Sequence, residues 1–437
     1  MEGAVVKKAV LIFMFLTLYV LLLIANISRQ DKDPQLVWQK CLGGSDWETG
    51  RSIQQTTDGG YIIAGESNSV DGDVTGNHGG FDFWIVQLDA SGDIIWQKCL
   101  GGSGNDYPTS IQETQGGGYV VAGYTNSTDG DVTGNHGGFD FWIVKLNTSG
   151  NILWQRCLGG SGNDYAMSIH QTIDGGYIVA GYSDSNDGHV TNNRGGFDFW
   201  IVKLNASGNI VWQKSLGGSS SDYARSVQQT NDGGYIVTGN TYSIDGDVTG
   251  HHGDDDVWVV RLSSTGSIIW QKCLGGSDWD RAYSTLQASD GTYMVAGYTK
   301  STDGSITTKH DGFDFWIVKL DTSGKIVWQR CLGGNGDDHA TSIWETKSGD
   351  FVVAGYTNST DGDVTGNHGG FDFWVIKLDK LGNLMWQKCL GGNAEDIAYS
   401  IQQTLDGGGI VAGHTISRTG DVSDHRGWID FWVVKLQ

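Results

Sequence analysis

Aspartate pairs followed by an asparagine recur in long polar segments of this 437-residue chain. Two aspartates at i and i+2 with an asparagine at i+6 cluster the oxygen ligands that calcium prefers. The complete copies are Asp71, Asp73 and Asn77; Asp129, Asp131 and Asn135; and Asp361, Asp363 and Asn367. The spacing is not that of an EF-hand, and loops closed by Asx turns without an ion are the competing interpretation. We therefore predict that calcium, if it binds, occupies these three loops, and that the histidine that follows, such as His136, holds the loop by a hydrogen bond.

Other acids and a serine recur at fixed positions in the chain, and we interpret them as structural. They are Asp82, Asp140, Asp198, Asp256, Asp314, Asp372 and Asp430; Glu48, Asp106, Asp164, Asp222, Asp280, Asp338 and Asp396; and Ser52, Ser110, Ser168, Ser226, Ser284, Ser342 and Ser400. Seven identical sites are rarely seven active sites, so we expect these carboxylates to accept hydrogen bonds from turn amides and serine hydroxyls. No nucleophile elbow, phosphate loop or zinc spacing is present, and we assign no catalytic residue. A glycosidase with paired carboxylates stays open.

Four tryptophans break the regularity of the chain: Trp47, Trp279, Trp344 and Trp428. Exposed tryptophans stack on sugar rings or anchor a protein partner. The competing interpretation is that these side chains fill space between repeats. We take Trp47, Trp279 and Trp428 as the candidate ligand-binding residues.

The elements that position these residues follow from a strict repeat of 58 residues. Two tryptophans mark it: Trp38, Trp96, Trp154, Trp212, Trp270, Trp328 and Trp386; and Trp84, Trp142, Trp200, Trp258, Trp316, Trp374 and Trp432. Each unit has four short segments rich in β-branched and aromatic residues, separated by Gly, Asn and Asp turns. Seven four-stranded meanders predict an all-β, seven-bladed β-propeller, with a β-helix as the alternative.

The phase of the repeat predicts how the ring closes. The repeat region opens with a fourth strand, 36–43, and ends with a third strand, 430–436. We expect the first to pair antiparallel with the second and complete the last blade, because an open array would leave unpaired strand edges. Trp47 and Trp428 would then flank this closure.

The six cysteines occupy one position of the repeat: Cys41, Cys99, Cys157, Cys273, Cys331 and Cys389. Equivalent positions in different blades lie farther apart than the ~7 Å Cα separation that a disulfide tolerates. We therefore predict six free thiols that pack as small hydrophobic groups.

The N-terminus differs in kind from the repeats. Lys7 and Lys8 precede an apolar run from Ala9 to Ala25. This pattern indicates a signal peptide or an N-terminal membrane anchor within residues 1–30, and the poor cleavage site at Leu23–Ala25 favours the anchor. Residues 31–437 form the propeller. The net charge of −22 disfavours a nucleic-acid partner. We expect the chain to contact the membrane only through its N-terminal segment.

The unit WQKCLGGSGNDYPTSIQETQGGGYVVAGYTNSTDGDVTGNHGGFDFWIVKL, residues 96–146, resembles the β-propeller repeats of secreted and cell-surface proteins of bacteria and archaea. The segments GGYVVAGYT and DFWIVKL carry the match, which extends from Trp38 to the C-terminus. The strand order also looks like that of WD-type propellers, which would put SIQET innermost and WQKCL outermost. By that analogy, the segments with Trp47, Trp279 and Trp428 open on one face. The resemblance implies the fold and export, and little chemistry.

These observations favour an exported protein, secreted or membrane-anchored at the cell surface, that binds a protein or a glycan without catalysis. A hydrolase or lyase that acts on polysaccharides is one alternative. A structural component of a surface layer is another.

Overall fold

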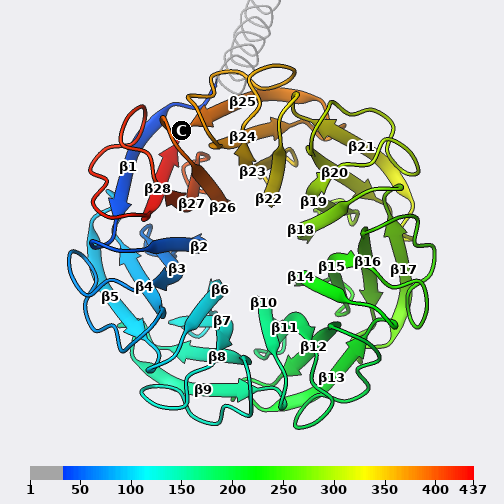
Figure 1. Cartoon of the computed structure of the whole chain (residues 1–437), viewed down its shortest axis with the longest axis horizontal. Helices are drawn as coiled ribbons and strands as arrows, with labels where there is room; N and C mark the ends of the chain where they lie inside the picture. Colours follow the sequence, from blue (N-terminus) through cyan, green and yellow to red (C-terminus); the bar gives the residue numbers. More distant parts are fainter. Residues whose placement is uncertain (1–32) are drawn as a thin grey trace, which may run out of the picture.

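The computed structural model describes residues 33–437, which form seven four-stranded antiparallel sheets arranged as a ring (Figure 1). These residues contain strands, turns and loops but no helix. The predicted seven-bladed β-propeller is confirmed. The predicted signal peptide or anchor at residues 1–30 lies outside the described residues. Among the described residues, no helix has the length and apolar character needed to cross a membrane.

In each blade the strands are counted from the central channel outward. The innermost strands are β2 (Glu48–Gln55), β6 (Asp106–Glu113), β10 (Asp164–Gln171), β14 (Asp222–Gln229), β18 (Asp280–Gln287), β22 (Asp338–Glu345) and β26 (Asp396–Gln403). The second strands are β3 (Tyr61–Ser67), β7 (Tyr119–Thr125), β11 (Tyr177–Ser183), β15 (Tyr235–Thr241), β19 (Tyr293–Thr299), β23 (Phe351–Thr357) and β27 (Gly409–Thr415).

The outer half of each blade completes the sheet. The third strands are β4 (Asp82–Leu88), β8 (Asp140–Leu146), β12 (Asp198–Leu204), β16 (Asp256–Leu262), β20 (Asp314–Leu320), β24 (Asp372–Leu378) and β28 (Asp430–Leu436). The outermost strands are β5 (Ile94–Leu100), β9 (Ile152–Leu158), β13 (Ile210–Leu216), β17 (Ile268–Leu274), β21 (Ile326–Leu332), β25 (Leu384–Leu390) and β1 (Leu36–Leu42). Blades 1 to 6 run in chain order from β2 to β25, and blade 7 has the order β26-β27-β28-β1.

Blade 7 closes the ring as predicted. Strand β1 pairs antiparallel with β28, and Cys41 lies opposite Trp432. The pairing extends beyond both strands, because Gln35 and Gln437 exchange backbone hydrogen bonds of 2.8 and 3.0 Å. Both ends of the repeat region are thereby held in one sheet, and β1 covers the edge that β28 would otherwise expose.

The core lies between neighbouring blades. The tryptophan of each third strand is buried, and it packs on the phenylalanine or valine of the preceding blade, as Trp142 does on Phe83 with centroids 4.6 Å apart. Its indole N–H donates to a glutamine of the outermost strand, such as Trp142 Nε1 to Gln155 Oε1 at 3.0 Å. Each indole therefore buries a large apolar surface without leaving its donor unpaired. The six cysteines of the described chain are free, as predicted, and burial raises their pKa values.

A closed circle of side-chain hydrogen bonds links the innermost strands. The repeated serine accepts a bond from a backbone amide of the next blade, such as Ile111 N to Ser52 Oγ at 3.2 Å. The bond recurs at all seven junctions, including Ile53 N to Ser400 Oγ across the closure. We expected these serine hydroxyls to donate to the repeated carboxylates, and this expectation is wrong. Their oxygens accept bonds that join neighbouring blades around the channel.

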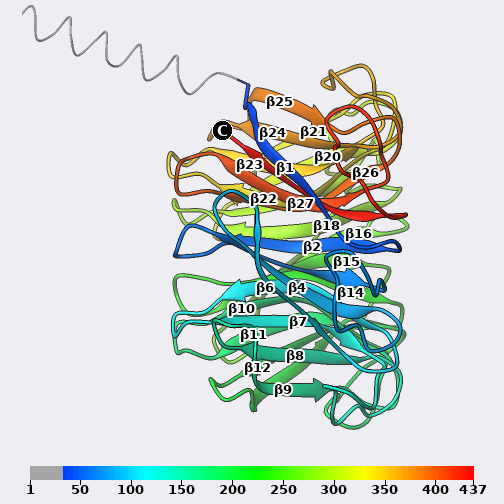
Figure 2. The same ribbon diagram turned by 90° about the vertical axis from the view of Figure 1, so that its left-hand side faces the viewer.

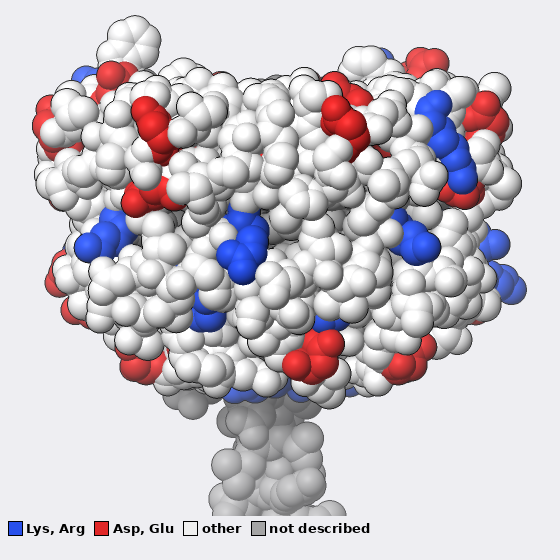
Figure 3. All heavy atoms as spheres, turned by 90° about the horizontal axis from the view of Figure 1, so that it is seen from below, with Lys and Arg blue, Asp and Glu red and all other residues white. Residues whose placement is uncertain are grey.

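The two ends of the ring differ in their connections (Figure 2). At one end, the segments that enter the innermost strands meet the long segments before the third strands, as in 43–48 and 68–81; we call this end the loop face. At the other end lie the short turns such as 56–60 and 89–93; we call it the turn face. The outer wall seen in Figure 3 carries scattered acidic and basic side chains without a continuous basic patch.

Candidate binding face

The three candidate tryptophans lie on the loop face. Trp47 and Trp279 directly precede β2 and β18, and Trp428 lies two residues before β28. Their exposed fractions are 44%, 41% and 79%. Large aromatic side chains are therefore presented to solvent at two places on this face.

Trp47 and Trp428 lie next to each other although almost the whole sequence separates them. Trp47 pairs with Ile429 in an isolated parallel β-bridge, and Trp428 N donates to Asp46 O at 3.1 Å. The Trp47 ring stands edge-on to Phe81, and its Nε1 donates to Thr49 Oγ1 at 3.2 Å. The closure of the ring thus brings together the backbone segments that carry these two exposed tryptophans.

The two tryptophans replace small or polar residues of the other blades. Asn105 and Asn163 stand where Trp47 does, and the Asn105 amide oxygen accepts the bond from Phe81 N at 3.1 Å. Gly80 stands where Trp428 does, and a Cβ there would lie 2.3 Å from the Asn105 amide oxygen. Loss of the asparagine removes one of the two close contacts at this position; the other is the backbone oxygen of Gly104, 2.5 Å from the same Cβ.

Trp279 repeats half of this arrangement at the junction of blades 4 and 5. It forms the other isolated parallel bridge of the described chain, with Asp255. The ring stacks on Phe313, and the Arg281 guanidinium and the Lys300 ammonium lie 5.4 and 5.7 Å from its centroid. Arg281 is itself fixed by Asp255, at 2.5 Å between Nε and Oδ2. These contacts hold the exposed indole in place, which lowers the entropy that a partner must remove.

The inner rim of the loop face carries features that the sequence analysis missed. An arc of aromatic rings runs over blades 1 to 4 with centroids 4.9 to 6.3 Å apart: Phe81, Tyr107, Tyr124, Phe139, Tyr165, Tyr182, Phe197 and Tyr223. A buried polar cluster at Asn240 and Asp255 interrupts the arc in blade 4. Aromatic rings resume in blades 5 and 6, where Tyr298 contacts Phe313 and Tyr356 contacts Phe371. The rim therefore carries two groups of aromatic rings with a polar interruption between them.

Two arginines extend from the innermost strands among aromatic rings. Arg51 pairs with Glu66 at 2.6 Å and lies 4.5 Å from the Tyr399 centroid. Arg225 lies 5.3 Å from the Tyr182 centroid and 5.7 Å from that of Tyr283. The signal in the sequence was the variable fourth residue of each innermost strand, where other blades have threonine, methionine or tyrosine.

The predicted calcium loops are held by hydrogen bonds within the chain. Asp71 Oδ1 accepts from Ser45 N at 2.7 Å, Asp73 Oδ2 accepts from Gly43 N at 3.3 Å, and Asn77 Nδ2 donates to Ser67 O at 2.9 Å. The same bonds recur for Asp129, Asp131 and Asn135, and for Asp361, Asp363 and Asn367.

The histidine of each loop makes a further contact, with the aspartate four residues later. As expected, His136 bonds through Nδ1 to Asp140, at 2.6 Å. Within residues 33–437, no three His, Cys, Asp or Glu side chains gather as metal ligands do. Calcium binding stays a prediction, and hydrogen bonds already account for the loop geometry.

The other repeated acids lie inside the protein. Asp106 is fully buried, and it accepts bonds from Gly102 N and Ser127 Oγ, both at 2.9 Å. Asp82 is equally buried beside it, and burial raises the pKa of Asp82 to about 6. These pairs recur between blades, as expected of structural groups, although the serine comes from the long loop. Because these repeated carboxylates are buried, a polysaccharide cannot contact them.

Comparison with known proteins gives the following likenesses. No family model matches the chain. Regulatory protein FlaEY of Caulobacter vibrioides is 26% identical over 305 residues, which are 62% of this chain and 31% of that protein. The chain thus spans about a third of the length of this curated relative.

Among solved structures, the Pan2 WD40 domain of Neurospora crassa is 10% identical and has a TM-score of 0.49, with 91% of this chain and 95% of that chain covered. BamB from Moraxella catarrhalis is 15% identical, has a TM-score of 0.46, and covers 92% and 99%. Sqt1 from Chaetomium thermophilum is 13% identical, has a TM-score of 0.45, and covers 91% and 99%.

Proposed function

We propose that the protein is a non-catalytic binding module that recognises a protein partner through its loop face, with Trp47 and Trp428 as the central anchor. One observation carries the proposal: Trp428 is 79% exposed at a position where most other blades have glycine. Exposing an indole gains nothing for folding, whereas buried tryptophan is the side chain most enriched among strong interface contacts.

The position of Trp279 supports a binding surface that is larger than one pocket. It lies on the same face at the junction of blades 4 and 5, whereas Trp47 and Trp428 lie at the junction of blades 7 and 1. Blades 2 to 4 keep asparagine or serine at its position. A flat face with separated, rigid aromatic anchors suits a folded protein, which buries about 800 Å² per partner. A glycan that stacks on the indoles is the second candidate, because sugar rings use the same aromatic faces.

We also propose that the ring acts at the cell surface. The support is the N-terminal sequence alone, in which Lys7 and Lys8 precede the apolar run to Ala25. Such a segment directs export or anchors the chain with its basic end inside.

The test uses substitutions to residues that other blades already carry. Trp47→Asn, Trp279→Asn and Trp428→Gly convert each position to the residue found at Asn105, Asn163 and Gly80. The purified full chain is screened on a glycan array and against folded envelope proteins. Binding that falls at least about tenfold in the triple variant supports the proposal. Trp344→Gln is the matched control, because Trp344 lies in the channel strand β22, where Gln54 stands in β2.

Three other results would contradict the proposal. Binding that survives the triple variant would place the partner elsewhere. Turnover of a polysaccharide would favour the hydrolase or lyase. Self-association without any other ligand would favour the surface-layer role.

A further inference from the structure

The junction of blades 6 and 7 lacks an aromatic ring that the other six junctions have. In those six, the first residue of the second strand packs on the outer tryptophan of the preceding blade, with centroids 5.7 to 6.3 Å apart. The pairs are Trp38–Tyr61, Trp96–Tyr119, Trp154–Tyr177, Trp212–Tyr235, Trp270–Tyr293 and Trp328–Phe351. At the seventh junction the tryptophan is Trp386 and its partner position holds Gly409.

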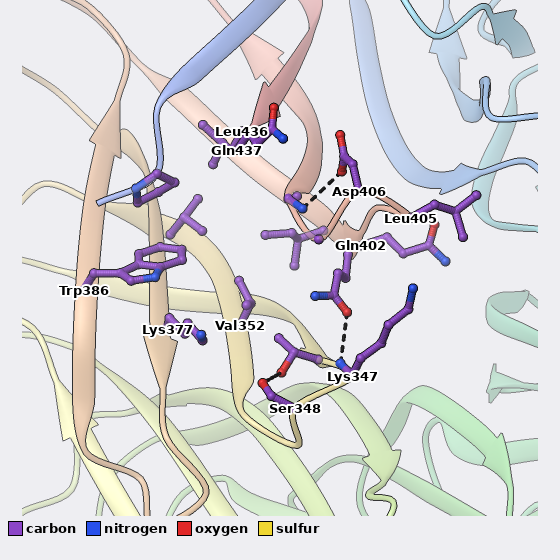
Figure 4. A pocket seen from close by; sticks show the side chains of 18 residues that line it. Lys347, Ser348, Val352, Lys377, Trp386, Gln402, Leu405, Asp406, Leu436 and Gln437 are labelled. Carbon is purple, nitrogen blue, oxygen red and sulfur yellow. Dashed lines mark hydrogen bonds between the residues drawn. The ribbon is translucent and has the colours of Figure 1, made fainter. Parts of the chain in front are cut away.

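A cavity of about 430 Å³ lies where that ring would be. Trp386, Val352 and Lys377 line it from blade 6, and Leu405, Asp406 and Leu436 line it from blade 7 (Figure 4). The turns 346–348 and 405–408 border it, so it belongs to the turn face. This volume falls within the range of about 300–1,000 Å³ that is usual for small-molecule sites.

A second difference changes what surrounds Trp386, which is half-buried like its counterparts. Buried Pro34 also lines the cavity. In the six other junctions, a turn between third and outermost strands places a glycine on the tryptophan ring, as Gly208 does on Trp154. In blade 7 those two strands come from opposite parts of the chain, and backbone bonds between Gln35 and Gln437 stand in place of the turn. Trp386 therefore lacks both of the contacts that cover its counterparts.

The position of Gly409 accepts a side chain without rearrangement. A Cβ built there meets no atom closer than Ile401 Cδ1 at 3.8 Å, and Gly409 lies in a regular register opposite Leu436. The cavity thus begins where the side chains of the equivalent tyrosines begin, and the backbone at Gly409 keeps the register of the other blades; we call this cavity the slot.

Lys377 gives the slot a polar end. At the corresponding place between blades 4 and 5, Arg261 Nε donates to the Tyr293 hydroxyl at 2.9 Å. Between blades 5 and 6, Lys319 Nζ lies 5.4 Å from the Phe351 centroid. The equivalent ammonium groups of Lys145, Lys203 and Lys435 donate to turn carbonyls and carboxylates. Lys377 is 11% exposed and lies 3.3 Å from Asp350. A phenol in the slot would lie beside Trp386 and present its hydroxyl to this ammonium.

We propose that the cavity between blades 6 and 7 binds a 4-hydroxyphenyl ring supplied by a ligand, in the orientation that the tyrosines adopt at the equivalent junctions. The site lies on the face opposite Trp47 and Trp428, and it is independent of the function proposed above. A free phenol and a tyrosine side chain share this chemistry.

The experiment measures binding of p-cresol to the full chain by NMR titration. We expect a Kd of about 1 mM, because so small a ligand offers few atoms for contact. Gly409→Tyr fills the slot, and we expect it to weaken binding at least about tenfold. Unchanged binding by this variant, or no binding by the parent chain at about 20 mM p-cresol, would overturn the proposal.

A matched pair of variants keeps the test decisive if Gly409→Tyr does not fold. Lys377→Met removes the ammonium at the slot, and we expect p-cresol binding to weaken while toluene binding is unchanged. Lys319→Met removes the equivalent ammonium where Phe351 already fills the space. Equal effects of the two variants on p-cresol binding would overturn the proposal.

N-acetyl-tyrosinamide identifies the source of the ring. Binding tighter than that of p-cresol indicates a tyrosine side chain, and weaker binding indicates a free phenol. Each result supports the slot and assigns its ligand.

Discussion

Blade 3 and blade 7 have the same four strands but differ at both faces. In blade 3, Tyr177 covers Trp154, and a Cβ at Gly196 would lie 2.4 Å from the Ser221 hydroxyl oxygen of blade 4. In blade 7 the equivalent positions hold Gly409 and Trp428. One residue opens a cavity on the turn face, and the other exposes an indole on the loop face. Closure of the ring needs only similar blades. Residues that depart from the repeat, such as Gly409 and Trp428, are therefore the candidates for a binding role.

The largest effect is expected from removal of the strand that makes blade 7 unlike the others. Deletion of Leu36–Leu42 exposes the edge of β28, and we expect aggregation or loss of the cooperative melting transition. A circular permutant that joins Gln437 to Gln35 by a short turn and opens at Asp232–Gly233 is the control, and it should melt near the parent chain. A deletion variant with unchanged melting would contradict closure.

The next effect comes from making blade 3 resemble blade 7. Tyr177 is buried, so Tyr177→Gly leaves a cavity beside Trp154 and should cost about 3–5 kcal/mol of unfolding free energy. Urea denaturation of this variant and of Gly409→Tyr measures the contrast, and Gly409→Tyr should not destabilise the ring. Equal destabilisation by both changes would show that the two junctions do not differ as described.

The buried carboxylates predict an unusual dependence of stability on pH. Burial raises the pKa of Asp164 to about 6 and that of Asp198 to about 7, while their unfolded values lie near 3.9. The folded state then binds more protons than the unfolded state, so stability falls as pH rises from about 4 to about 7. His339 opposes this trend in part, because burial lowers its pKa to about 4. Melting temperatures from pH 4 to pH 8 test the sign.

Two substitutions compare a buried aspartate that lacks a histidine contact with one that has it, by the same measurement of melting temperature. Asp198 receives a backbone bond from Arg194 and lacks the histidine contact that Asp140 has with His136. Asp198→Asn should therefore raise the melting temperature at pH 8, whereas Asp140→Asn should raise it less or lower it. The reverse order would contradict the role given to burial.

The smallest effect concerns the three complete loops. If calcium binds there, chelator should lower the melting temperature, and Asp129→Asn should remove only part of the shift, because three loops share the pattern. The Ser103 amide already holds the pKa of Asp129 below its usual value, so the loop keeps its shape through that bond. Equal melting in chelator and millimolar calcium would leave these loops as plain turns.

Much of the fold was predictable because one spacing of 58 residues repeats without insertion. Strand number and closure follow from it, whereas the radial order of the strands and the face that carries Trp47 and Trp428 were inferred from the resemblance to WD-type propellers. The direct backbone bonds between the segments of these two residues were not predictable, since they depend on the packing of the loops at the closure. The cavity was missed although Gly409 stands where the other repeats have tyrosine or phenylalanine, because the sequence does not show that this position packs on Trp386.

The serine error has a physical cause as well. Ser52 and the acids recur with the same period, and a period does not say which partners meet. In the ring, Ser52 faces the next blade, while Ser127 of the long loop reaches Asp106.

The central claim is that the indoles at the closure recognise a partner. Its most direct measurement is the affinity of Trp47→Asn/Trp428→Gly for the ligand that the protein screen or the glycan array identifies, beside the parent chain and Trp344→Gln. The account predicts at least about a tenfold loss for the double variant and none for the control, at unchanged melting temperature. Equal affinity of the double variant and the parent chain would contradict it.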